Sequence, residues 1–151
     1  AAAAAPGALT VSYHLASAPS PTTSVSFEVT LFNHSAQPVK LDGTTLRYWI
    51  DGDASTTAVA IDWASIGTSS VDAKVASSPQ GNQAGYLEIG FHDVTLPAYG
   101  TTGPILVRYH RIDWGSFDPS RDDSFGRSTA DQPWPRIGLY QDGRLVSGKL
   151  P

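Results

Sequence analysis

The sequence predicts an all-β fold, an antiparallel β-sandwich with jelly-roll topology and about nine strands. Apolar and polar residues alternate in short segments that turn-forming residues separate at regular intervals. No segment shows the apolar period of an amphipathic helix. With 151 residues, the chain is long enough for one domain with a substantial core.

The first half of the chain has clear period-two alternation, as in Leu9, Val11, Tyr13 and Leu15. We expect strands at Leu9–Leu15, Val25–Leu31, Val39–Leu41, Thr44–Ile50 and Val59–Trp63. In the last of these, Trp63 shares a face with the apolar residues. Asp62 therefore points the opposite way unless a bulge intervenes.

The second half continues the pattern. We expect strands at Val71–Ala76, at Leu87–Phe91, through Arg108, at Ile137–Tyr140 and at Arg144–Val146. Residues 77–84 are polar and predict a loop. Asp142-Gly143 predicts a tight hairpin turn, because that dipeptide favours the positive φ angles such turns require.

The segment Val107–Gly126 begins as a strand and ends as an acidic loop. At period two, Arg108, His110, Ile112 and Trp114 lie on one face. In a straight strand, Arg108 and Trp114 are roughly 20 Å apart, at about 3.3 Å per residue. That spacing suits an extended ligand.

Composition excludes several classes of protein. A net charge of -4, with basic residues scattered along the chain, argues against nucleic acid. The absence of cysteine excludes disulfides and thiolate metal sites. No apolar run approaches the length of a membrane span. Residues 1–8 resemble the end of an Ala/Pro-rich linker, so we expect the domain to occupy residues 9–151.

Catalysis is the weaker functional reading. None of the four histidines belongs to a recognisable catalytic motif. A glycosidase needs two carboxylates that flank a cleft, and sequence alone leaves such a pair open. Carboxylates on a β-protein are more often solvated or turn-forming, so we predict that the chain is not an enzyme.

Two acidic loops each follow an apolar strand. One contains Asp51 and Asp53, and the other contains Asp118 and Asp122. If the strands are neighbours, the carboxylates converge on one hard cation, for which oxygen ligands suit calcium. The alternative is ordinary Asx turns, in which the side chain bonds its own loop.

The tryptophans suggest a ligand. Trp49 lies inside a strongly apolar strand and is expected to be buried, whereas Trp114 stands where a strand breaks into a polar loop. An exposed ring offers apolar area with little entropy to lose. Sugar rings have apolar C–H faces that stack there, while charged side chains bind the hydroxyls.

Five segments together carry a family resemblance: LRYWIDGD, AIDWASIG, GYLEIGF, RYHRIDWGSFDPSRDDSF and LYQDGRLVSGKLP. In order and spacing they resemble a family 3 carbohydrate-binding module, over nearly all of residues 9–151. The resemblance implies a nine-stranded jelly roll, a structural calcium ion and a planar strip that binds crystalline cellulose. Such modules occur in secreted bacterial cellulases and cellulosome scaffolds.

By position, the resemblance implies a strip made of Asp62, Trp63, Arg108 and Trp114. Asp62 and Arg108 would form an ion pair that lies flat against a sugar ring. Trp63 stands where members often have histidine, and Trp114 matches the strip's tryptophan.

The chain also departs from the family pattern. The strip's usual tyrosine falls near Val71, which cannot stack as an aromatic ring does. Asp123 replaces a tyrosine that anchors a neighbouring cellulose chain, and Thr129 falls at another anchor position and keeps a hydroxyl. For calcium, Asp51, Asp53, Asp118 and Asp122 match, and Arg121 would contribute its backbone carbonyl.

The leading hypothesis is a noncatalytic, monomeric module that binds crystalline cellulose and is covalently linked to a secreted catalytic or scaffold protein. A second is an accessory module that has lost flat-surface binding and assists a neighbouring glycoside hydrolase. A third is a purely structural scaffold module. The feature that discriminates among them is whether Trp63, Arg108 and Trp114 are coplanar and exposed.

Overall fold

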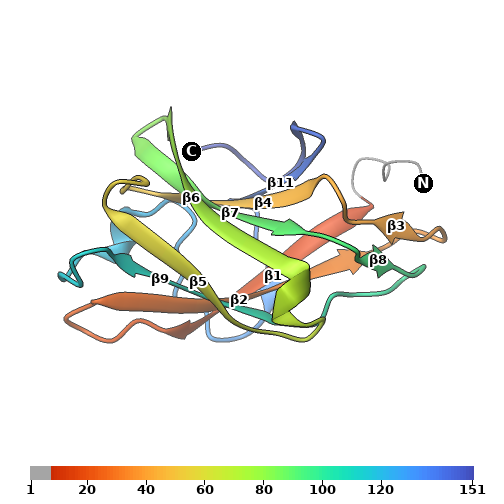
Figure 1. Ribbon diagram of the computed structural model, residues 1–151, viewed down its shortest axis with the longest axis horizontal. Helices are drawn as coiled ribbons and strands as arrows, with labels where there is room; N and C mark the ends of the chain where they lie inside the picture. Colours follow the sequence, from red (N-terminus) through yellow and green to blue (C-terminus); the bar gives the residue numbers. More distant parts are fainter. Residues whose placement is uncertain (1–7) are drawn as a thin grey trace.

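The computed structural model describes residues 8–151, which form two five-stranded antiparallel sheets packed face to face (Figure 1). In the first sheet the order is β10 (Gln132–Pro133), β1 (Leu9–Ser17), β2 (Ser24–Asn33), β9 (Ile105–Arg111) and β5 (Thr57–Ala64). In the second it is β12 (Arg144–Ser147), β11 (Ile137–Gln141), β4 (Thr44–Ile50), β7 (Gln83–Phe91) and β6 (Val71–Gln80). A separate pair consists of β3 (Val39–Lys40) and β8 (Thr95–Leu96).

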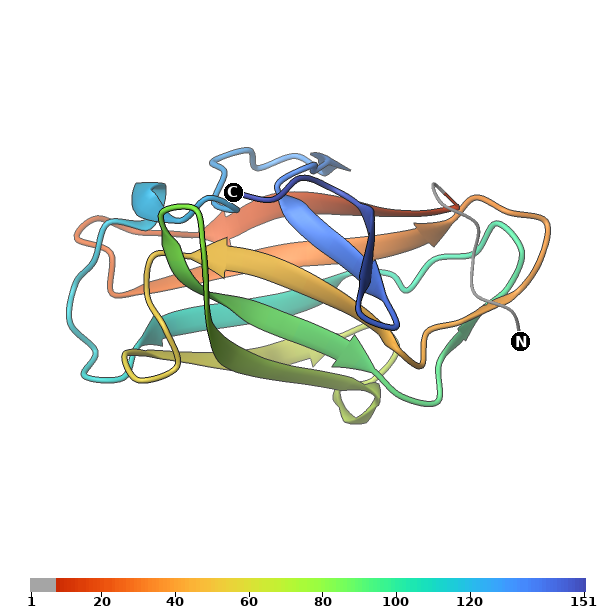
Figure 2. The ribbon, with the colours of Figure 1, turned by 90° about the horizontal axis from the view of Figure 1, so that it is seen from above.

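The strands of both sheets run along the long axis of the molecule, and most connecting loops lie at its two ends (Figure 2). Two single-turn 3₁₀ helices, η1 (Thr68–Ser70) and η2 (Pro119–Arg121), lie in these connections. Among residues 8–151, no helix is long and apolar enough to cross a membrane.

The core lies between the sheets and is formed by the inward half of each alternating strand. Its centre is aromatic: the rings of Phe27 and Tyr48, from opposite sheets, stack with centroids 4.3 Å apart. Tyr13 packs 5.6 Å from Phe27, and its hydroxyl donates to the carbonyl oxygen of Gly126 at 2.7 Å. Burying each such ring stabilises the fold by about 1.5–3 kcal/mol, and the bonded hydroxyl avoids the cost of an unpaired polar group.

The predicted fold class is confirmed, although the described residues form twelve strands rather than about nine. The sequence missed β8 and β10, which have two residues each. Of the predicted linker remnant at residues 1–8, only Ala8 falls within the described residues. Asp142 and Gly143 adopt φ angles of 49° and 82°, which confirms the hairpin turn between β11 and β12.

The loop predicted at residues 77–84 is wrong. β6 and β7 continue their pairing through Ser77 and Gly85, and again at Gln80 and Gln83. Gln83 is buried, and its polar groups are satisfied there: its side-chain amide donates to the carbonyl oxygen of Arg121 at 3.0 Å, and its amide oxygen accepts from the Asp123 N–H at 2.9 Å. These contacts tie a polar hairpin to the acidic loop.

The condition that the strand stays straight as far as Trp114 is not met, because β9 ends at Arg111. There the Trp114 N–H donates to the carbonyl oxygen of Arg111 at 2.9 Å, which closes a turn. The Asp113 carboxylate accepts from Arg111 Nε at 3.2 Å and from the Gly115 N–H at 2.8 Å. Trp114 consequently has a φ of 59°, and its ring returns toward β9 instead of extending beyond it.

Candidate functional site

The outer face of the first sheet presents the side chains of β9 that alternate with its core residues. Leu106, Arg108 and His110 point outward, whereas Val107 and Tyr109 are buried. β5, at the edge of this sheet, pairs directly with β9. The candidate site is therefore built on two adjacent strands of a rigid sheet.

A bulge in β5 decides which residues reach this face. Ile61 pairs with Val107, but Trp63 pairs with Leu106, so Asp62 is an extra residue opposite β9. Both Asp62 and Trp63 are therefore exposed. The sequence analysis named such a bulge as the condition under which Asp62 and Trp63 could share a face.

Asp62 and Arg108 form a two-pronged ion pair across the strands. Arg108 Nε lies 3.0 Å from Asp62 Oδ2, and Arg108 Nη2 lies 3.2 Å from Asp62 Oδ1. Two parallel N–H···O bonds hold the guanidinium and carboxylate close to one plane. Both side chains are one-third exposed, and exposed pairs contribute little to stability. The role that fits the pair better is to present a flat polar surface to a ligand, and not to stabilise the fold.

Two tryptophans flank the ion pair. Trp63 is 50% exposed and Trp114 is 54% exposed, which confirms the exposure expected for Trp114. The Trp114 ring stacks on His110, with centroids 3.5 Å apart and planes 9° apart. Trp49, by contrast, is 2% exposed and packs against Tyr86.

Trp63, Asp62, Arg108 and Trp114, called the strip below, lie in order along β9. Trp63 is beside Leu106, Asp62 contacts Arg108, and Trp114 covers His110. These β9 positions are two residues apart, so the whole strip spans about 13 Å. Arg108 and Trp114 are only about 7 Å apart along β9, rather than the roughly 20 Å of a straight strand. Sequence reasoning placed His110 on this face and gave it no role.

Two further positions that the resemblance singled out, Val71 as a lost aromatic and Thr129 as an anchor, lie elsewhere. Val71 is 5% exposed and belongs to the core, so it offers no surface to a ligand. Thr129 is exposed in the segment leading to β10, next to Ser128, whose carbonyl oxygen accepts from the Leu15 N–H of β1. β2 lies between that strand and β9. Thr129 is thus near the edge of the first sheet that lies opposite the β5 edge, away from the strip.

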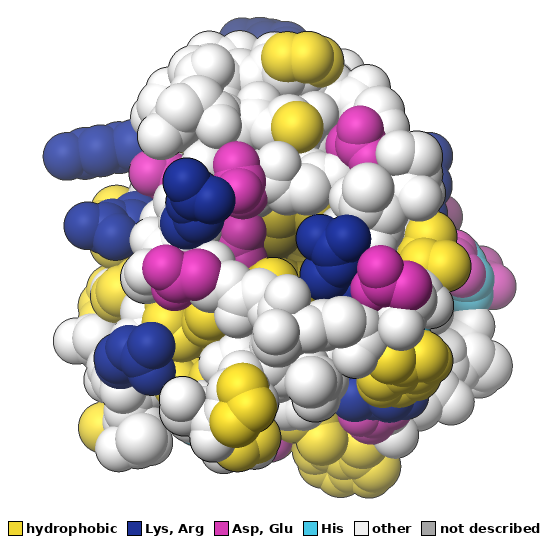
Figure 3. Space-filling model, turned by 90° about the vertical axis from the view of Figure 1, so that its left-hand side faces the viewer, with side chains coloured by type: hydrophobic (Ala, Val, Ile, Leu, Met, Phe, Trp, Pro, Cys, Tyr) yellow, Lys and Arg dark blue, Asp and Glu magenta, His cyan; other side chains and the backbone are white. Residues whose placement is uncertain are grey.

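The five residues predicted for calcium all line one cavity of about 450 Å³: Asp51, Asp53, Asp118, Arg121 and Asp122. It opens at the end of the sandwich where the loops after β4 and β9 meet, and Figure 3 shows acidic and basic side chains around a hollow at this end. β4 and β9 are not neighbours in one sheet, because they belong to opposite sheets. The carboxylates approach one another across the sandwich.

Asp122 is the buried member of this group, at 5% exposure. Its Oδ1 accepts from the Asp51 N–H at 2.8 Å, and its Oδ2 accepts from the Tyr109 hydroxyl at 2.6 Å. Burial raises the pKa of Asp122 to about 6, a shift that these two hydrogen bonds oppose and that the charges of Asp51 and Asp118 increase. A cation in the cavity would favour the charged form.

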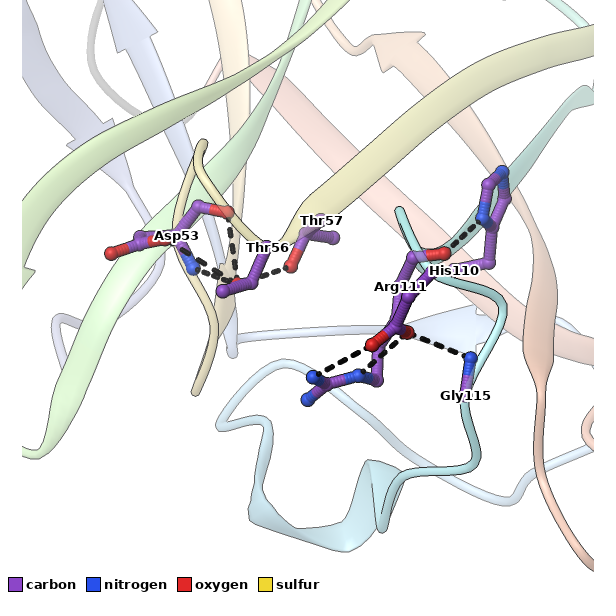
Figure 4. A network of polar contacts seen from close by, with 7 residues as sticks. Asp53, Thr56, Thr57, His110, Arg111 and Gly115 are labelled. Atoms are coloured by element: carbon purple, nitrogen blue, oxygen red, sulfur yellow. Dashed lines mark hydrogen bonds and ion pairs between the residues drawn. The ribbon is translucent and has the colours of Figure 1, made fainter.

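Asp53 and Asp118 form the Asx-type turns that were the alternative reading. Asp53 Oδ1 accepts from the Ser55 N–H at 3.0 Å and its hydroxyl at 2.6 Å (Figure 4 shows the neighbouring contacts with Thr56). Asp118 Oδ1 accepts from the same groups of Ser120, also at 3.0 and 2.6 Å. These bonds lower the pKa of both carboxyls. Within residues 8–151, no three His, Asp or Glu side chains are grouped closely enough to hold a metal ion as they stand.

Two curated relatives match this chain over a small part of their own length. Endoglucanase A of Paenibacillus lautus is 36% identical over 123 residues, 79% of this chain and 18% of that protein. Beta-mannanase/endoglucanase A of Caldicellulosiruptor saccharolyticus is 35% identical over 127 residues, 79% of this chain and 9% of that protein. The chain thus spans less than a fifth of the length of either relative.

Solved structures share the whole fold. The carbohydrate-binding module CBM3b from the cellulosomal cellobiohydrolase 9A of Clostridium thermocellum has a TM-score of 0.85 at 26% identity, covering 95% of this chain and 99% of that one. A family IIIA CBD from Clostridium cellulolyticum has a TM-score of 0.85 at 28% identity, covering 98% and 100%.

The β-sandwich and its structural neighbours define a noncatalytic carbohydrate-binding module. The match of the cellulose binding domain model to residues 10–148 gives the family: the chain belongs to the family 3 cellulose-binding modules. The enzyme names of its relatives describe much longer proteins.

Proposed function

We propose that this module binds the flat surface of crystalline cellulose through the strip and thereby targets an attached enzyme or scaffold to plant cell wall polysaccharide. The observation that carries the proposal is the alignment of two half-exposed indoles with a flat ion pair on one sheet. The rings supply apolar area for the C–H faces of sugars, and the Asp62–Arg108 pair supplies donors and acceptors for hydroxyls.

The rigid sheet that carries the strip favours a ligand that is itself a flat surface. The strip residues lie on β5, β9 and the turn that follows, and the sheet pairs β9 on both edges, with β2 and β5. A site that is ordered before binding loses little conformational entropy on a flat, rigid surface. The acidic cavity lies at the end of the sandwich, and none of the four strip residues lines it.

The names of the relatives support an attached partner and an extracellular location. Matches include Endoglucanase A of Paenibacillus lautus and Cellulosomal-scaffolding protein A of Acetivibrio thermocellus. We place the module outside the cell, where insoluble cell wall polysaccharide is found, as a monomeric unit of a longer enzyme or scaffold.

The test is adsorption to microcrystalline cellulose, with Trp63→Ala and Trp114→Ala beside the wild type. Tyr99→Ala is the matched control, because Tyr99 is 70% exposed on a loop away from the strip. Each strip variant should bind more weakly, whereas the control should bind like the wild type. Unchanged adsorption of both strip variants would remove the proposed site.

The accessory function is the second candidate, and two observations favour it. Val71 is buried where the family's strip has an aromatic residue, and Asp123 stands where the family has a tyrosine that anchors a neighbouring chain. A module with this shortened strip would bind single glucan chains instead of a surface. Adsorption that short soluble cello-oligosaccharides compete away would favour this function over surface binding.

We also propose that the acidic cavity holds a structural calcium ion. Its donors are oxygen atoms, which calcium prefers, and the turn contacts of Asp53 and Asp118 run to Oδ1, leaving Oδ2 for a cation. The Arg121 carbonyl could add a further oxygen. A ligand bound only by the folded state at a hundredfold excess over Kd adds about 2.7 kcal/mol of stability.

Chelation therefore tests the calcium proposal. Removing calcium with a chelator should lower the Tm by about 5–10 °C for a domain of this size. Added calcium should restore the original Tm. Asp122→Asn should respond less. An unchanged Tm together with no metal by elemental analysis would refute the proposal.

A further inference from the structure

His110 is the side chain on which Trp114 rests. The imidazole and indole planes differ by 9° and their centroids are 3.5 Å apart, so one face of the indole is covered and the other remains available. His110 Nδ1 donates to the carbonyl oxygen of Arg111 at 2.6 Å, which fixes the rotation of the imidazole. In Figure 4 the ring of His110 and the guanidinium of Arg111 point to opposite sides of the chain.

The surroundings of His110 give it room for this contact. Its cross-strand partners are Ser24 on β2 and Ala58 on β5, both with small side chains. His110 is partly exposed and lies outside the core. The contact with Trp114 is thus the main packing available to the imidazole on this face.

Trp114 needs such support more than Trp63 does. Trp63 lies within a paired strand, whereas Trp114 follows the end of β9 in a turn and has a φ of 59°. The hydrogen bonds of that turn fix its backbone and the Asp113 side chain. They leave the indole free to rotate about its own side-chain bonds.

We propose that His110 is a positioning residue for ligand binding, which holds the Trp114 ring in the orientation that a sugar surface contacts. This inference rests on the proposed function of the strip. A ring that is already ordered loses less rotamer entropy on binding, a gain of ~2- to 10-fold in affinity for one large side chain.

The binding experiment is a double-mutant cycle on microcrystalline cellulose with His110→Ala, Trp114→Ala and both together. His110→Ala should weaken wild-type binding ~2- to 10-fold and should have no effect when Trp114 is already alanine. His110→Phe, which keeps a ring, should restore most of the affinity. An equal loss in both backgrounds would overturn the proposal, because His110 would then act independently of Trp114.

A second measurement does not depend on cellulose. In protein labelled with 5-fluorotryptophan, the Trp114 resonance is identified by its absence in Trp114→Ala. In His110→Ala this resonance should move toward the shift of free 5-fluorotryptophan and sharpen, while the other three tryptophan resonances stay in place. An unmoved resonance would overturn the positioning role, even if wild-type protein adsorbs. Failure of the wild type to adsorb would instead refute the proposed function of the strip.

Discussion

The left-handed backbone of Trp114 predicts that ligand binding and stability oppose each other at this position. A non-glycine residue with φ near 59° carries steric strain of about 1–2 kcal/mol. Trp114→Ala retains that strain, whereas Trp114→Gly relieves it. Glycine costs about 0.5–1 kcal/mol more in conformational entropy on folding, so the Gly variant should be about 0.5–1 kcal/mol more stable than the Ala variant.

Thermal or urea unfolding of the two variants measures this difference. A difference of about 0.5–1 kcal/mol corresponds to roughly 1–4 °C in Tm for a domain of this size. Both variants should lose cellulose binding to the same extent, because each lacks the indole.

Trp63 supplies the matched control. It lies in β5, in extended backbone that any residue adopts, so Trp63→Gly should be less stable than Trp63→Ala by about 0.5–1 kcal/mol. The order of stability should therefore reverse between the two positions. If Trp114→Gly proves no more stable than Trp114→Ala, the strain in this turn does not exceed the entropic cost of glycine, which would refute the reasoning.

Three further predictions concern the interior. In calcium-free buffer, burial raises the pKa of Asp122 from 3.8 to about 6. The folded state therefore binds the carboxyl proton more tightly than the unfolded state does. The stability gained from this proton is complete below about pH 4 and is lost as the pH rises through about 6. The loss should be on the order of 2–3 kcal/mol by urea unfolding, and Asp122→Asn should lack it; the same pH dependence in both proteins would contradict the assignment. Phe27→Ala, which removes a fully buried ring stacked on Tyr48, should cost about 3–5 kcal/mol in the same assay, and a loss below 1 kcal/mol would argue against this packing. Tyr109→Phe removes the donor to Asp122 Oδ2 and should lower the free energy of unfolding by about 1–3 kcal/mol at pH 7.5. The loss should be smaller at pH 4.5, where the Asp122 carboxyl is protonated. An equal loss at both pH values would refute that reasoning.

The sequence predicted the fold well because burial in a sandwich imposes period-two alternation on each long strand. Two-residue strands such as β8 and β10 are too short to show a period. The pairing of Ser77 and Gln80 with β7 was missed for another reason: backbone hydrogen bonds hold an edge strand whose side chains are mostly exposed and polar.

The candidate site was less predictable. The resemblance placed Asp62, Arg108 and Trp114 near one another, but the return of Trp114 onto His110 depends on a positive φ that bulky residues rarely adopt. The pattern put His110 on the correct face without indicating a partner. The cavity likewise depends on loops from opposite sheets, a proximity that no local spacing expresses.

The bulge at Asp62 has a consequence for how such a surface can change through evolution. In a regular strand, an acid and an aromatic residue that are adjacent in sequence face opposite sides, so the single extra residue allows both to face the ligand. Loss of that one codon would restore regular pairing with β9 while removing the partner of Arg108. A module of this family could therefore lose ligand binding through a single deletion and keep its fold. The length of β5 would then be a more informative marker of function than the amino-acid composition of β5.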